Sequence, residues 1–153
     1  MADRDKTIRK FDLAAGQRFT TAEFLLANEF HRDAMYLGGY VVECALKALI
    51  LKWSPAKEFA DTLSLLTEVG AKGHDFEYLK GLLKRRKFGF PLTGPAEDMP
   101  PDSALFPHEV RQSLARVFTW DTSERYEVSQ IQFKEADGFV AAVKTIRDWT
   151  RRS

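Results

Sequence analysis

Cysteine and histidine, the residues that most often build disulfide frameworks and metal centres, are scarce in this sequence. Cys44 is the only cysteine, so the chain cannot form an intramolecular disulfide. The three histidines, His31, His74 and His108, lie far apart and form no zinc-binding spacing with that cysteine. We therefore expect no bound metal. The 153 residues are long enough to fold around an apolar core of their own, as a single domain over 1–153.

The sequence also lacks an excess of charge of one sign. Lysine and arginine together number 23 and aspartate and glutamate 22, which gives a formal net charge of +1. This balance argues against a protein whose whole surface binds nucleic acid, although a local basic patch is compatible with it. Hydrophobic residues make up 44% and charged residues 29% of the chain, values typical of a folded domain rather than a disordered segment.

Motifs of several enzyme and targeting classes are absent. There is no glycine-rich phosphate loop and no G-x-S-x-G nucleophile elbow, and we expect no cofactor. The charged N-terminal residues lack the apolar region of a secretory signal, which predicts a cytoplasmic protein. Residues 34–51 are apolar enough to suggest a membrane span. They contain Glu43 and Lys47, which are unfavourable in a bilayer, so we predict a buried helix and no membrane association.

Signals for β-strands are weak, whereas apolar residues recur at helical spacing along most of the chain. Five of the six prolines fall within residues 88–107, where we expect a loop. The sequence thus predicts an all-α bundle with four or five main helices. The helices are expected over residues 6–27, 31–52, 55–69, 108–120 and 133–151, with a further one capped by Asp75.

Two charged residues interrupt the apolar helix over residues 31–52. Glu43 and Lys47 are four positions apart, so they share a helix face and can form an ion pair. Either this pair is an ordinary exposed salt bridge, or it marks a polar site inside the bundle or at a dimer contact. The burial of the two side chains distinguishes these interpretations. Cys44 lies on the same apolar helix, and we expect its thiol to be buried and unreactive.

A basic run closes the helix that begins at Asp75, and no acidic residue lies between Glu77 and Glu97. Such a run can bind the phosphates of RNA or of another polyanion. It can equally be the solvated last turn of a helix, where cations are favourable. A second basic cluster in the last helix allows the same two interpretations. The run comprises Lys80, Lys84, Arg85, Arg86 and Lys87, and the second cluster comprises Lys144, Arg147, Arg151 and Arg152.

The segment before the last helix contains Trp120, Arg125 and Tyr126. The planar guanidinium group of Arg125 can hold a carboxylate or a phosphate. Alternatively, Arg125 pairs with an internal carboxylate such as Glu43, with Tyr126 packed beneath it. The candidate binding residues are therefore Arg125 and Tyr126 together with Glu43 and Lys47. Each of the three histidines is expected to have a structural or solvent-facing role, because no spacing around it supports catalysis or metal binding.

Taken together, these segments resemble the HEPN superfamily of small α-helical proteins. Residues 34–48 are similar to the family's A-x-y-h-x-x-x-A-x-E-x-x-L-K-A helix, in which y is aromatic and h is apolar. Gly73-His74-Asp75 and the residues up to Leu79 are similar to its x-H-D-L-x-x-L turn. Trp120 with Arg125-Tyr126 resembles its W-x-x-x-x-R-Y segment.

The resemblance implies an up-and-down helical bundle that is often dimeric. Members act as RNases, as toxins paired with minimal nucleotidyltransferase antitoxins, or as noncatalytic RNA-binding or scaffold domains. The RNase members use an R-x4-6-H motif, which this chain lacks, because Gln130, Ile131 and Gln132 stand at the required spacing after Arg125. Glutamine cannot act as a general acid or base at neutral pH.

We therefore expect a noncatalytic HEPN-type module. It would form a homodimer and bind a nucleotidyltransferase-like protein, RNA or both, as part of a toxin–antitoxin or defence system. The first alternative is an RNase with a non-standard catalytic set, in which Arg125 and His74 converge on one phosphate. The second alternative is a nucleotide-binding or small-anion-binding domain that uses Glu43, Lys47 and Arg125.

Overall fold

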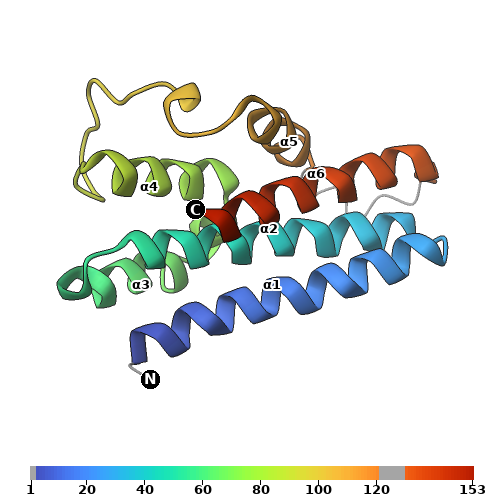
Figure 1. Ribbon diagram of the computed structural model, residues 1–153, viewed down its shortest axis with the longest axis horizontal. Coiled ribbons are helices and arrows are strands. Elements are labelled where there is room, and N and C mark those ends of the chain that lie inside the picture. The colour runs from blue at the N-terminus through green and yellow to red at the C-terminus, as the bar shows by residue number, and fades with distance from the viewer. Residues whose placement is uncertain (1–2, 121–129) are drawn as a thin grey trace.

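The computed structural model describes residues 3–120 and 130–153, and these ranges contain helices and loops but no β-strand (Figure 1). The fold is therefore all-α, as the sequence predicts. The α-helices are α1 (Asp3–Ala27), α2 (His31–Trp53), α3 (Phe59–Thr67), α4 (Phe76–Phe88), α5 (His108–Phe118) and α6 (Phe133–Arg152). The 3-10 turns are η1 (Ala56–Glu58), η2 (Gly70–His74) and η3 (Asp102–Ala104).

Helix α2 lies at the centre of the bundle, between α1 on one side and α4 and α6 on the other (Figure 1). Among the described helices, α2 alone is long and apolar enough to cross a membrane. The fold buries 83% of its apolar 18-residue window, as expected for a core helix. Gly38 permits a close approach of α6, because a Cβ atom there would lie 3.1 Å from side-chain atoms of both Phe139 and Val143.

Helix α1 runs antiparallel to α2 and is fixed at both ends (Figure 1). At the α1–α2 turn, the amide of Phe30 donates to the carbonyl of Leu25, and Glu29 adopts a left-handed backbone with φ of 68°. This is a Schellman-type cap. At the opposite end, the guanidinium of Arg4 donates to the carbonyls of Lys52 and Ser54. These carbonyls lie at the end of α2, where the helix backbone provides no amide to bind them.

The predicted helix boundaries hold best for the long, strongly periodic helices α2 and α6. The region predicted as one helix over residues 55–69 is instead divided into η1 and the shorter α3. Asp75 caps α4 as predicted, because its Oδ1 accepts hydrogen bonds from the amides of Glu77 and Tyr78. Gly89, with φ of 75°, ends that helix.

The proline-rich segment after α4 packs onto the bundle, although it contains no α-helix. The side chain of Phe106 is 1% exposed, and its ring centroid lies 5.2 Å from that of Trp149 on α6. Within the segment, η3 is closed by the amides of Leu105 and Phe106, which both donate to the carbonyl of Asp102. The loop predicted over residues 88–107 is thus present, but it contributes a turn and a core residue.

Candidate functional site

Glu43, Lys47 and His74 form a polar cluster that joins α2 to η2. Glu43 and Lys47 are buried, with residue exposures of 8% and 4%. Lys47 Nζ donates to Glu43 Oε2 at 3.1 Å, and His74 Nδ1 lies 2.8 Å from Glu43 Oε1. The two carboxylate oxygens therefore have different partners. The burial answers the question that the spacing leaves open, because this pair lies inside the bundle rather than on its surface.

The backbone of η2 comes close to α2 and α3 because residue 73 is glycine. A Cβ atom at Gly73 would lie 2.8 Å from the carbonyl oxygen of Leu66 and 3.7 Å from Lys47 Nζ. The ammonium group of Lys47 is therefore covered by the η2 backbone. Asp75 then caps the start of α4. In this segment, Gly73 therefore approaches α3 closely, His74 contacts Glu43 and Asp75 caps α4.

The histidine of this cluster connects the buried carboxylate to the surface. Its side chain is 57% exposed, whereas that of Glu43 is 11% exposed. Because an ionised carboxylate only accepts hydrogen bonds, Nδ1 of His74 must carry the proton and donate it. In the neutral form of the ring, Nε2 then carries the lone pair. A carboxylate that orients an exposed imidazole in this way is an arrangement suited to proton transfer or to binding a polar ligand.

Arg125 and Tyr126, the other predicted binding residues, lie outside the described residues. Trp120, at the end of the described segment, packs edge-on against Phe139 at a centroid distance of 5.8 Å. No group of three or more His, Cys, Asp or Glu side chains that could hold a metal ion occurs in residues 3–120 and 130–153. Cys44 is buried, and this burial raises the pKa of its thiol, as expected for an unreactive cysteine.

Two lysines of the basic run bind the proline-rich segment. Lys80 Nζ and Lys84 Nζ each donate to a different carboxylate oxygen of Asp102, both at 2.9 Å. Partial burial alone would raise the pKa of Asp102, but these hydrogen bonds hold it below its usual value. Burial alone would lower the pKa of Lys80, but its bonds to Asp102 and Glu77 raise it. Asp102 thus joins the segment to α4.

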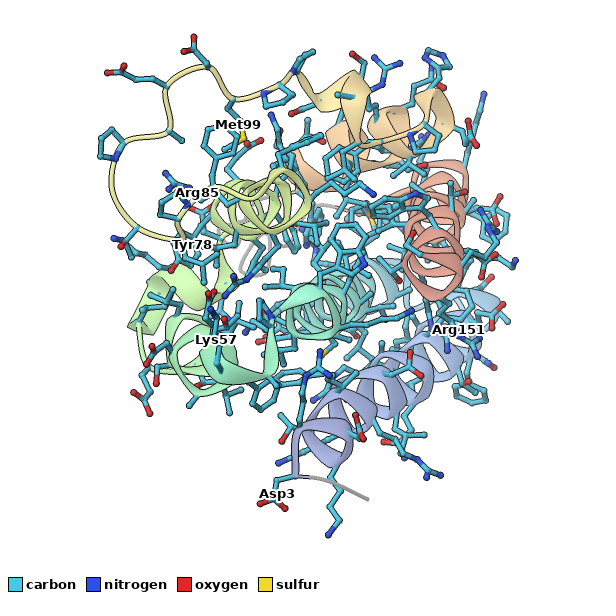
Figure 2. All side chains as sticks on the ribbon, turned by 60° about the vertical axis from the view of Figure 1, so that its left-hand side comes forward. Asp3, Lys57, Tyr78, Arg85, Met99 and Arg151 are labelled. Carbon is cyan, nitrogen blue, oxygen red and sulfur yellow. The ribbon has the colours of Figure 1, made fainter. Side chains whose placement is uncertain are left out.

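The other three residues of the basic run also have partners within the chain. Arg85 donates to the carbonyls of Pro91 and Gly94, as the loop leaves and passes over α4 (Figure 2). Arg86 binds the Glu58 carboxylate and the Thr62 hydroxyl, and its side chain is only 7% exposed. Lys87 stacks over the Trp53 ring at 5.4 Å from its centroid. All five cations of the run therefore contribute to the fold, which sequence spacing alone did not indicate.

Three exposed phenylalanines lie in the segments at the end of the bundle where α1 ends and α2 and α6 begin. We call Phe24, Phe30 and Phe133 the terminal patch; their exposures are 64%, 54% and 52%. Two contacts bring the starts of α2 and α6 together. His31 Nδ1 lies 2.8 Å from the Ile131 carbonyl, and the His31 and Phe133 ring centroids are 5.8 Å apart. The sequence pattern does not indicate this patch, because its members come from three different segments.

The exposed charged residues near the terminal patch in the sequence are mostly acidic. Phe24 and Phe30 each follow a glutamate in the sequence, and one helical turn separates Phe30 from Asp33 and Phe133 from Asp137. Lys134 is an exposed cation in the same region. The exposed acidic neighbours are Glu23, Glu29, Asp33 and Asp137. The exposed phenylalanines thus have mostly acidic exposed residues near them in the sequence, which favours partners of opposite charge.

Comparison with protein-family models, with curated proteins and with solved structures finds no significant match to this chain.

Proposed function

We propose that this chain is a noncatalytic HEPN-type module that binds a nucleotidyltransferase-like partner protein through the terminal patch. The observation that carries the proposal is the exposure of Phe24, Phe30 and Phe133 together at one end of the bundle. Exposed apolar groups of this kind favour a protein contact, because binding removes them from water. Aromatic side chains are also the commonest energetic centres of protein interfaces.

Two of the segments that carry the HEPN resemblance meet in space, which supports this part of the proposal. Glu43 belongs to the helix motif and His74 to the turn motif, 31 positions later, and the two side chains form a hydrogen bond of 2.8 Å. In a noncatalytic module, this contact would fasten η2 to α2. The antiparallel packing of α1 and α2 is also compatible with the up-and-down bundle of that family.

Charge favours a protein partner over RNA at the terminal patch. The four acidic neighbours of the patch would repel phosphate groups, whereas basic residues on a partner protein would be attracted to them. The basic run already has partners within the chain, which are Asp102, Glu58, two backbone carbonyls and the Trp53 ring. RNA bound there would have to compete with these contacts. The partner surface should therefore combine an apolar pocket with basic residues around it.

The test is co-expression with a minimal nucleotidyltransferase-like protein from the same genome, followed by size-exclusion chromatography and titration calorimetry. We expect a complex with the wild-type chain. The double variant Phe24→Gln/Phe30→Gln should bind at least about tenfold more weakly, since truncating a central aromatic costs more than 1 kcal/mol. Leu13→Gln is the matched control, because Leu13 lies on the same helix outside the patch and is 52% exposed. Equal affinity of all three proteins, or no complex, would refute the proposal.

A second candidate function, acid–base cleavage of RNA, is favoured by one specific observation. The exposed ring of His74 is oriented by the buried carboxylate of Glu43, which leaves Nε2 available for proton transfer. The test is metal-free incubation of the purified protein with labelled single-stranded RNA. Cleavage that is lost in both His74→Gln and Arg125→Ala would establish an RNase. Absence of cleavage would leave the noncatalytic function.

A further inference from the structure

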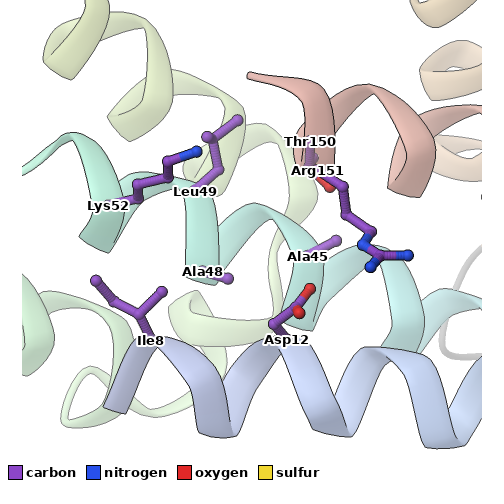
Figure 3. Close-up of a pocket in the computed structure, with 8 residues that line it drawn as sticks. All are labelled: Ile8, Asp12, Ala45, Ala48, Leu49, Lys52, Thr150 and Arg151. Carbon is purple, nitrogen blue, oxygen red and sulfur yellow. The ribbon is translucent and has the colours of Figure 1, made fainter. Parts of the chain in front are cut away.

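We propose that the hollow between α1, α2 and the last turn of α6 binds a small zwitterion of the amino-acid class. This hollow has a volume of about 310 Å³ (Figure 3). Its lining residues come from the first half of α1 and the second half of α2, whereas the terminal patch lies where α1 ends and α2 begins. Three helices meet there, and each contributes residues. The lining comprises Ile8, Asp12, Ala45, Ala48, Leu49, Lys52, Thr150 and Arg151.

The charged groups at this hollow are complementary but do not pair with each other. Asp12 points up from α1 and Arg151 reaches down from α6 (Figure 3). Among the described residues, neither side chain makes a hydrogen bond or an ion pair, even though Asp12 is half-buried. A half-buried carboxylate without a partner favours an incoming cation. Lys52, the third charged group, already donates to the Ser153 carbonyl at 2.9 Å.

The ligand class follows from the charged groups, the apolar lining and the volume of the hollow. An ammonium group would bind the Asp12 carboxylate, and a carboxylate would bind the planar guanidinium of Arg151. Ala45 and Ala48 leave room between the helices, and Ile8 offers an apolar wall for an aliphatic side chain. The volume is at the lower end for ligand sites, which suits a molecule of amino-acid size.

Titration calorimetry with L-leucine, 3-methylbutylamine and 4-methylpentanoate tests this assignment, because the three probes share an aliphatic chain and differ in charged groups. We expect saturable binding of leucine, with each single-charge analogue at least about tenfold weaker. Asp12→Asn should abolish the preference for leucine over 4-methylpentanoate. Arg151→Gln should abolish the preference for leucine over 3-methylbutylamine.

The controls are Asp5→Asn and Arg152→Gln, which remove exposed charges from the same two helices outside the hollow. Both should bind leucine as the wild type does. Ala48→Leu should block the hollow while retaining a good helix former, and it should lose binding with unchanged circular dichroism. Absence of leucine binding to the wild type, or equal binding by Asp12→Asn, Arg151→Gln and Ala48→Leu, would overturn the assignment.

Discussion

A methyl group added at Gly73 would meet the backbone of α3, whereas one added at Gly81 would meet nothing within 4 Å. Gly73→Ala should therefore destabilise the fold by about 1–3 kcal/mol, because the Leu66 carbonyl cannot move away freely. Gly81→Ala, inside α4, should stabilise it by about 0.5–1 kcal/mol by reducing the freedom of the unfolded chain. Urea unfolding of the two variants measures both values. Equal effects at the two sites would contradict the close approach of η2.

Removal of one charge from the buried cluster should be more harmful than removal of two. Glu43→Gln leaves the Lys47 ammonium buried without its carboxylate, and we expect a loss of roughly 3–5 kcal/mol of unfolding free energy. The double variant Glu43→Leu/Lys47→Met removes both charges and should lose less. Urea unfolding at pH 7 measures both free energies. A loss below about 0.5 kcal/mol for Glu43→Gln would mean that the pair behaves like an exposed salt bridge.

At the scale of elements, Asp102 holds the proline-rich segment on α4. Asp102→Asn should speed the amide exchange of Leu105 and Phe106 by roughly threefold to tenfold, because two charge-assisted hydrogen bonds weaken. Asp98→Asn is the control, since Asp98 is an exposed acid of the same segment. Hydrogen exchange followed by mass spectrometry measures the effect. The same rate in both variants would show that Phe106 alone anchors the segment.

The contact between Asp102 and the lysines of α4 should also depend on pH, and it should weaken both at low pH and at high pH. The folded-state pKa of Asp102 is lowered, so its contribution is present above the unfolded value of about 3.9 and is lost as the pH falls further. The folded-state pKa of Lys80 is raised, so its contribution is present below about 10.4 and is lost as the pH rises further. The exchange rate of the Phe106 amide, corrected for intrinsic exchange, should therefore be lowest between these limits. A corrected rate that rises steadily between pH 5 and 9 would contradict this account.

The sequence predicts those helices and helix ends that depend on residues close together in the chain. The apolar periodicity of α2 and α6 and the Asp75 cap are local signals, and the structure agrees with them. The partners of the basic run are not local, because Asp102 lies 22 residues after Lys80 and Glu58 lies 28 residues before Arg86. The spacing of Glu43 and Lys47 is likewise the same in a buried and an exposed pair. Only the packing of other elements around α2, including η2 near Lys47, decides between them.

At the scale of the whole molecule, the internal and external charges have separate roles. The cluster around Glu43 and the run from Lys80 to Lys87 hold helices and the loop together, while the phenylalanines of the terminal patch are exposed. This division could not be predicted from composition, because a net charge of +1 does not show which charges are internally paired. The apolar residues of the patch also follow no helical stripe, since each comes from a different element.

The most direct test of the proposed partner contact is hydrogen exchange of the chain with and without the nucleotidyltransferase-like protein. The account predicts that binding slows amide exchange over residues 22–33 and 131–137, which carry the terminal patch, and leaves η2 and the start of α1 unchanged. Protection centred on η2 and His74, or on the first half of α1, would contradict the central claim, because the partner would then bind a different surface.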